Sequence, residues 1–259
     1  MTDHAAAADL LLNNWAATTR ITELPEALRP RSRGEGYDAA AAVAARSGST
    51  VAGWKIAATS EAGQKHINVD GPIIGRILKS RLLPEGASVT LGDNIMRVAE
   101  AEFAFGFAKD LAPRAAPYTQ DEVLDAVGSL HLSIEVPDSR YVDFTKVGAA
   151  QLIADTACAS WMVLGPAVGR PWRDLDLSSH AVKGLLNGAV KAEGTGKAVL
   201  GDPRKALTWF VNEASTYCGG VKAGQFVTTG TCIVPMAVTP GDVVTIDYGV
   251  LGTISCRIA

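Results

Sequence analysis

Two glutamates separated by a single residue stand in an otherwise apolar stretch of the sequence. Glu100 and Glu102 lie in residues 97–107, whose composition is typical of a β-strand. Alternate residues of a strand point to the same face, so the two carboxyl groups should lie side by side. Burying such a pair is costly unless an arginine or lysine, a shared proton or a divalent cation compensates the charge. The alternative is that both glutamates are exposed on an edge strand.

A third glutamate lies in a second apolar stretch that also has the pattern of a strand. Glu135 falls within residues 131–138, far along the chain from the first pair. Three carboxylates that meet would form the all-oxygen site that Mg²⁺ or Mn²⁺ prefers, with octahedral positions left for water or a bidentate substrate. This hypothesis requires that the two strands lie next to each other.

A divalent cation held in this way suits the chemistry of a 2-oxo acid. The carboxylate and the adjacent carbonyl oxygen of such a substrate chelate one cation, which withdraws electrons from the carbonyl group. When a double bond is conjugated to the carbonyl, water can add at C4 while negative charge gathers on the C2 oxygen. The same enolate would stabilise loss of CO₂ from a longer dioic acid. The far end of the substrate then decides between hydration and decarboxylation.

The elements that must position these residues indicate the α+β class. Residues 5–19 and 37–46 are predicted helices, so we expect a helical N-terminal region over residues 1–50. Short apolar runs punctuated by glycine and proline follow it. They predict a β-rich catalytic body over residues 51–259, built as an antiparallel sheet or part-barrel.

Two helices are predicted within this body. The first begins at a capping box on Thr119, and apolar residues at helical spacing extend it through Val127 to Leu130. The second begins at Asp202, which is followed by proline at the first helical position. The strands that we expect cover residues 51–56, 75–77, 88–91, 97–107, 130–136, 225–229, 233–238, 243–248 and 253–258.

An ordered set of motifs along nearly the whole chain resembles one known family. The E-A-E pair at 100–102 and the run I-E-V-P-D-S-R at 134–140 are similar to the hydratase/decarboxylase branch of the fumarylacetoacetate hydrolase superfamily. That branch includes 2-oxopent-4-enoate hydratases and 4-oxalocrotonate decarboxylases. Further matching segments are residues 53–56, 155–165, 186–188, 194–201, 222–224, 229–231, 240–242 and 247–252.

The resemblance implies a fold, a cofactor and a set of site residues. It implies a β-rich roll with a helical N-terminal region, a homo-oligomer, and Mg²⁺ or Mn²⁺ bound by Glu100, Glu102 and Glu135. Lys55 matches the active-site lysine of the family, so we expect Lys55 and Glu135 to be catalytic. Lys55 would serve as a cation for the substrate carboxylate or as a proton donor. The residues expected to contact substrate are His66, Cys158, Ser160 and Thr231.

The sequence departs from the family pattern at two places. Ile73 stands in P-I-I-G where relatives often have aspartate after the proline. The run T-A-C at 156–158 replaces the usual N-A-S. Both places lie near expected substrate contacts, so they affect which substrate the protein takes.

Composition and charge exclude several other classes of protein. The chain is 47% hydrophobic and 20% charged with a formal net charge of −3, which argues against disorder and against a nucleic-acid partner. No membrane-spanning segment or secretory signal is predicted, and four cysteines without a CxxC motif suit the reducing cytoplasm.

The function that we expect from these observations is a metal-dependent hydratase acting on a small 2-oxo-enoate in aromatic catabolism. The alternatives are a 2-oxo-3-enedioate decarboxylase, an acylpyruvate C–C hydrolase and a catalytically silent binding scaffold. The hydrolase is less favoured because no His–Glu dyad of that kind is found.

Overall fold

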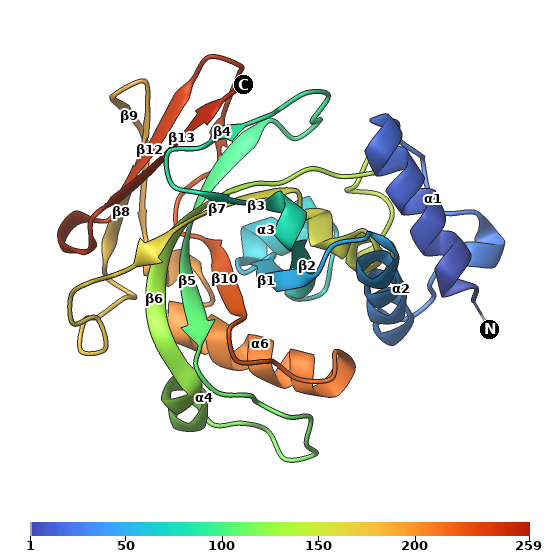
Figure 1. Cartoon of the computed structure of the whole chain (residues 1–259), viewed down its shortest axis with the longest axis horizontal. Helices are drawn as coiled ribbons and strands as arrows, with labels where there is room; N and C mark the ends of the chain where they lie inside the picture. The colour runs from blue at the N-terminus through green and yellow to red at the C-terminus, as the bar shows by residue number, and fades with distance from the viewer. Residues whose placement is uncertain (1) are drawn as a thin grey trace.

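Three short helices form the N-terminal region of the computed structural model, which describes residues 2–259 (Figure 1). They are α1 (His4–Ala17), η1 (Glu26–Leu28) and α2 (Arg33–Arg46). Asp3 and Ser32 cap α1 and α2 by accepting hydrogen bonds from backbone amides of the first turns. A separate apolar cluster joins these helices to Tyr141 and to α5 (Ala149–Ala154). The division of the chain at residue 50 stays a prediction.

The larger of two curled sheets carries the site. Its strands follow the order β2-β1-β10-β5-β6-β7-β3, and β11 pairs separately with β5. Most neighbours are antiparallel, but β1 with β10 and β3 with β7 are parallel. The strands are β1 (Val51–Ala57), β2 (Ile73–Leu78), β3 (Leu82–Pro84), β5 (Val98–Phe107), β6 (Val127–Val136), β7 (Trp161–Ala167), β10 (Phe226–Thr231) and β11 (Met236–Ala237).

The smaller sheet, of order β4-β13-β12-β8-β9, encloses the main core together with the first (Figure 1). The core includes Phe103 and Phe105 of β5, which are fully buried. The strands are β4 (Ser88–Val89), β8 (Ala181–Leu186), β9 (Ala189–Thr195), β12 (Val243–Asp247) and β13 (Thr253–Ile258). The remaining helices are α3 (Glu61–His66), η2 (Lys79–Arg81), α4 (Gln120–Ala126), η3 (Thr156–Cys158), η4 (Gly196–Ala198), α6 (Pro203–Tyr217) and η5 (Gly249–Leu251).

The α+β class and the β-rich part-barrel with a helical N-terminal region are confirmed. The predicted extent of one helix is wrong: α4 ends at Ala126, and Val127 and Leu130 belong to β6. Val127 pairs with Phe107 of β5 and is buried in the core, so tertiary pairing outweighs the helical spacing. Of the strand predicted at residues 233–238, only Met236–Ala237 forms.

Strands β3, β7, β8 and β9 and the short helices α3 and α5 were not predicted. Within residues 2–259, no helix is both long enough and apolar enough to cross a membrane.

Candidate metal centre and cavity

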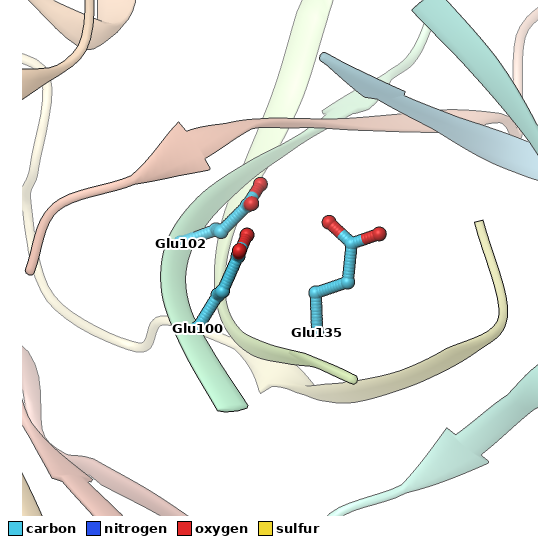
Figure 2. A group of neighbouring side chains, drawn as sticks. All are labelled: Glu100, Glu102 and Glu135. Atoms are coloured by element: carbon cyan, nitrogen blue, oxygen red, sulfur yellow. The ribbon is translucent and has the colours of Figure 1, made fainter. Parts of the chain in front are cut away.

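Pairing of β5 with β6 brings the three glutamates together. Glu100 lies opposite Glu135 in the antiparallel register, and Glu102 lies two residues further along β5 on the same face. Each residue offers a carboxylate oxygen, and these oxygens lie within 4.8 Å of one another (Figure 2). The two strands are thus neighbours, as the metal-site hypothesis requires.

Burial leaves several of these oxygens without partners. The exposed fraction is 0% for Glu102 and 1% for Glu135. One oxygen of Glu102 accepts a hydrogen bond from the Gly230 amide at 2.8 Å, whereas its Oε1 and the Oε2 of Glu135 have no partner among the described residues, and Oε1 of Glu135 has only the ion pair with Lys55. Unpaired buried carboxylate oxygens are strongly unfavourable unless a cation meets them. The donor set therefore fits a hard divalent cation.

Lys55 of β1 reaches the same cluster from across the sheet. Its Nζ lies 3.2 Å from Oε1 of Glu135 and donates a hydrogen bond to the Ala157 carbonyl oxygen at 3.0 Å. Burial by itself lowers the pKa of this lysine. The attraction of Glu135, Glu100 and Glu102 outweighs burial, so the net pKa lies above the ordinary value and the ammonium stays charged.

The three carboxyl groups have pKa values shifted toward neutrality. Burial is the main cause for each, and repulsion between the carboxylates adds to it, while Lys55 acts in the opposite direction. The pKa rises to about 7 for Glu100 and Glu102 and to about 8 for Glu135. Such shifts are typical of functional carboxylates held together in a buried site.

A cavity of about 740 Å³ opens next to this cluster. Lys55 and Glu100 line it, and its walls are largely apolar, with Ile73, Met96 and Phe144 among them. Its volume is in the range of small-molecule sites. Much of the wall comes from residues 56–67, between the end of β1 and the residue after α3, and from residues 230–235, which include the last two residues of β10.

Three of the four residues expected to contact substrate line this cavity. They are His66 at the end of α3, Cys158 of η3 and Thr231 of β10. Ser160 is buried and is not among the lining residues. Whether these side chains bind substrate stays a prediction. The backbone amide of Gly230, which precedes Thr231, donates to Glu102.

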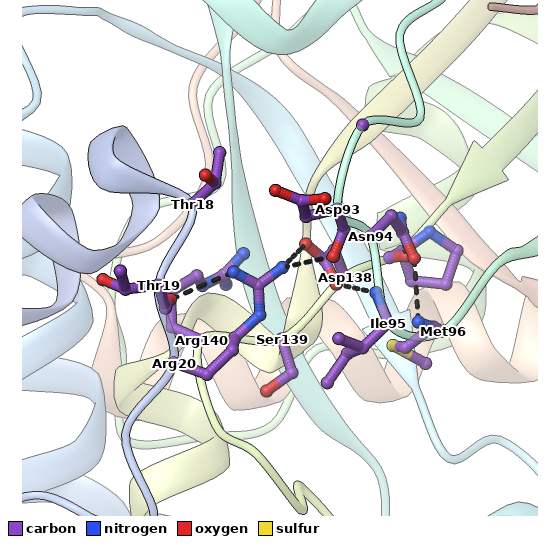
Figure 3. Close-up of polar contacts among 12 residues, drawn as sticks. Thr18, Thr19, Arg20, Asp93, Asn94, Ile95, Met96, Asp138, Ser139 and Arg140 are labelled. Atoms are coloured by element: carbon purple, nitrogen blue, oxygen red, sulfur yellow. Dashed lines mark hydrogen bonds and ion pairs between the residues drawn. The ribbon is translucent and has the colours of Figure 1, made fainter.

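A polar network fixes the chain immediately after Glu135 (Figure 3). Arg20, from the segment after α1, forms a 2.6 Å ion pair with Asp138. The other oxygen of Asp138 accepts from the Ile95 amide at 3.0 Å, and the Asn94 side chain donates to the Pro137 carbonyl at 2.8 Å. The network holds the 93–96 segment against the end of β6, which places Met96 in the cavity wall.

The sequence reasoning missed the left-handed turn formed by Thr156–Cys158 and its contact with Lys55. The usable signal was the D-S-R run at 138–140 after the third glutamate, because Ser139 and Arg140 both hydrogen-bond Asp155 at the start of that turn.

Comparison with known proteins places this geometry in a family. The model of the fumarylacetoacetate (FAA) hydrolase C-terminal family matches residues 57–259. The chain is 32% identical over 211 residues to 4-oxalocrotonate decarboxylase of Pseudomonas putida, covering 81% of this chain and 78% of that protein. It is 34% identical over 185 residues to 2-keto-4-pentenoate hydratase of Burkholderia vietnamiensis, covering 71% and 68%.

A solved structure supports the same assignment over almost the full length. The 4-oxalocrotonate decarboxylase from Pseudomonas putida G7, complexed with magnesium and adipate, superimposes with a TM-score of 0.87 at 26% identity, covering 99% of this chain and 97% of that one. From the family match over most of its length and from these relatives, the chain belongs to the fumarylacetoacetate hydrolase family.

Proposed function

We propose that the protein is a divalent-metal-dependent hydro-lyase. It adds water to a conjugated 2-oxo-enoate of the 2-hydroxypenta-2,4-dienoate type and gives a 4-hydroxy-2-oxo acid in aromatic catabolism. The observation that carries the proposal is the cluster of Glu100, Glu102 and Glu135, with unpaired buried oxygens, next to a largely apolar cavity. Relatives named as hydratases and as decarboxylases support it.

The chemistry divides between the cation site and the side chains around it. A bound Mg²⁺ or Mn²⁺ would be held by the three glutamates and would supply Lewis-acid polarisation of the C2 carbonyl of a 2-oxo acid. The ammonium of Lys55 places a fixed positive charge beside that centre, for the substrate carboxylate or for an oxygen that gains negative charge. Glu135 orients the ammonium through its 3.2 Å ion pair. The apolar walls exclude water from the substrate's tail.

Decarboxylation of a 2-oxo-3-enedioate is the second candidate, and one observation favours it. Ile73, at the position where relatives often have aspartate, is fully buried and lines the cavity. Hydration needs a group that accepts a proton from the attacking water, whereas loss of CO₂ needs only stabilisation of the enolate. An aliphatic wall at this position removes one candidate base and leaves enolate stabilisation intact.

An activity screen with added Mg²⁺ tests both candidates. Loss of conjugated absorbance with 2-hydroxypenta-2,4-dienoate supports the hydratase, and CO₂ release from a 2-oxo-3-enedioate supports the decarboxylase. Glu102→Gln should stay folded and lose at least about 100-fold in turnover, because it removes one charge from the cation site. The exposed Glu122→Gln is the matched control and should retain activity. Full turnover after chelation, or in Glu102→Gln, would refute the proposal.

We also propose a homo-oligomer located in the cytoplasm, taking a small 2-oxo acid as substrate. A small apolar cluster on the larger sheet, in which Phe226 and Ile77 are buried and Leu82 and Leu164 are partly exposed, is a candidate contact between copies through those two leucines. All four cysteines are free thiols, as is usual in a reducing compartment. The molar mass from light scattering tests whether the protein is an oligomer. If a Leu82→Glu variant stays multimeric, this surface is not the contact between copies.

A further inference from the structure

Three consecutive residues beside the cation site adopt a left-handed backbone. The φ angles are 51° at Thr156, 51° at Ala157 and 62° at Cys158. L-residues avoid this region because Cβ approaches the following carbonyl oxygen, which costs about 1–2 kcal/mol for each residue. Such a turn persists only where surrounding contacts hold it, and strained segments of this kind are concentrated at functional sites. The contacts that hold it therefore carry information about the site.

One buried guanidinium spans both ends of this turn. Arg140, whose side chain is 1% exposed, forms an ion pair through Nε with the Asp155 carboxylate before the turn. Its Nη1 donates to the Ala159 carbonyl after the turn at 3.0 Å, and its Nη2 donates to the Thr156 hydroxyl at 3.3 Å. The planar fork of arginine can serve these separated acceptors together, whereas the single ammonium of lysine cannot.

The central carbonyl group of the turn contacts the site. The Ala157 oxygen accepts the hydrogen bond from Lys55 Nζ at 3.0 Å, and the Cys158 oxygen accepts from the Asp138 amide at 3.0 Å. We propose that Arg140 is a positioning residue for Lys55: it holds the left-handed turn whose central carbonyl keeps the ammonium beside Glu135. This inference rests on the proposed role of Lys55 in the lyase reaction.

The N-terminal helix supports Arg140 from its other side. The ring of Trp15, near the end of α1, lies 4.2 Å from the guanidinium carbon of Arg140 and 4.7 Å from that of Arg81. Arg81 in turn lies 4.5 Å from the ring of Trp161. Stacking of guanidinium groups on aromatic faces restricts their orientation. The helical region thereby contributes to the site without touching the cavity.

Arg140→Lys tests the proposal because it keeps a cation against Asp155 but cannot bridge the turn. Without the Ala157 carbonyl, Lys55 pairs more closely with the glutamates and competes with a divalent cation. We expect the dissociation constant for Mg²⁺, measured by titration calorimetry, to rise about 5- to 10-fold through this competition. We expect kcat to fall about 10- to 100-fold from the displaced group, with KM changed less than about threefold.

A double-mutant cycle with Lys55→Met shows whether the effect passes through Lys55. In the Lys55→Met background, Arg140→Lys should leave Mg²⁺ affinity within about twofold if the two residues are coupled. Arg46→Lys is the matched control, since Arg46 forms an exposed ion pair with Asp9 between α1 and α2 and should change nothing. If Arg140→Lys fails to fold, Trp15→Leu takes its place, with a smaller change in the same direction.

The inference is overturned if Arg140→Lys leaves Mg²⁺ affinity and kcat unchanged, or changes them equally with and without Lys55. Where Trp15→Leu is the variant used, unchanged values overturn it as well. The Mg²⁺-binding measurement does not depend on turnover. A protein that binds Mg²⁺ but converts no 2-oxo-enoate refutes the proposed function, whereas the Mg²⁺ affinities of the variants still show whether Arg140 and Lys55 are coupled. If no cation binds, urea-unfolding midpoints of the parent, the two single variants and the double variant show whether Arg140 and Lys55 are coupled.

Discussion

Binding of Mg²⁺ to the glutamate cluster should release about two protons near pH 7. The pKa is about 7 for Glu100 and Glu102 and about 8 for Glu135, mainly because of burial. At pH 7 the first two are each about half protonated and the third about nine-tenths protonated. All three must be ionised to bind the cation, whereas Lys55 keeps its proton throughout. The apparent affinity should therefore rise steeply with pH up to about 7 and level off above about 8.

Titration calorimetry in buffers of different ionisation enthalpy measures this proton release directly. The observed heat should vary linearly with buffer enthalpy, and the slope gives the number of protons. Glu102→Gln should lower that number by at least about one-half at pH 7, because one half-protonated group is gone and its repulsion of Glu135 is gone with it. Glu122→Gln is the matched control, since hydrogen bonds from Arg114 first, and then from Thr119, lower the pKa of this exposed residue to about 2 and it is ionised throughout.

A proton number near zero at pH 7 would refute the reasoning. It would mean that the three carboxyl groups are already ionised in the metal-free protein, so that burial and mutual repulsion do not control them. An affinity that stays constant between pH 6 and pH 8 would lead to the same conclusion.

Three further predictions concern stability. Metal-free Glu102→Gln should be more stable than the parent above about pH 7, by roughly 1–3 kcal/mol in urea unfolding, and equal to it below about pH 4.5. The reason is that the raised pKa of Glu102 stabilises the folded parent only while the carboxyl group is protonated. This contribution is lost as pH rises through about 7. Gly75→Ala should fail to reach a native-like fold in circular dichroism and proteolysis, because its Cβ would lie 1.8 Å from the Thr156 carbonyl oxygen. Phe105→Ala should lower the free energy of unfolding by about 3–5 kcal/mol in chemical denaturation, because the ring is fully buried in the core; a loss below about 1 kcal/mol would mean that the core repacks.

The cluster of three glutamates was predictable because it depends on strand geometry. A two-residue spacing places Glu100 and Glu102 on one face of any strand, and pairing of β5 with β6 then adds Glu135. The same local reasoning failed at Val127, where the helical spacing continues past the point at which pairing with β5 begins. The periodicity of apolar residues indicates which face of an element is buried, but it does not indicate where a helix ends and the next strand begins.

The surroundings of the cluster were not predictable, because they come from segments with no periodic pattern. The turn at Thr156–Cys158 depends on Arg140 and on the absence of a side chain at Gly75, and neither constraint lies in the sequence of the turn itself. Ser160, two residues after Cys158, was expected to contact substrate, but of these two residues Cys158 alone is among the cavity-lining residues. In a left-handed turn the side-chain directions cannot be inferred from strand or helix spacing.

Strand β5 shows how one segment can carry buried charge and still fold. Its alternate residues Phe103 and Phe105 pack in the main core, and burial of each such ring contributes about 2–3 kcal/mol of hydrophobic free energy. On the same strand, the backbone carbonyl of Glu102 accepts a hydrogen bond from the hydroxyl of Tyr248 at 2.9 Å. The ring of Tyr248 also packs edge-on against Phe103, with centroids 5.1 Å apart. The backbone of β5 is therefore held by its apolar face and by its own hydrogen bonds, in addition to any contact that the Glu100 and Glu102 carboxylates make. A site built in this way can keep unpaired carboxylates in place until a cation arrives.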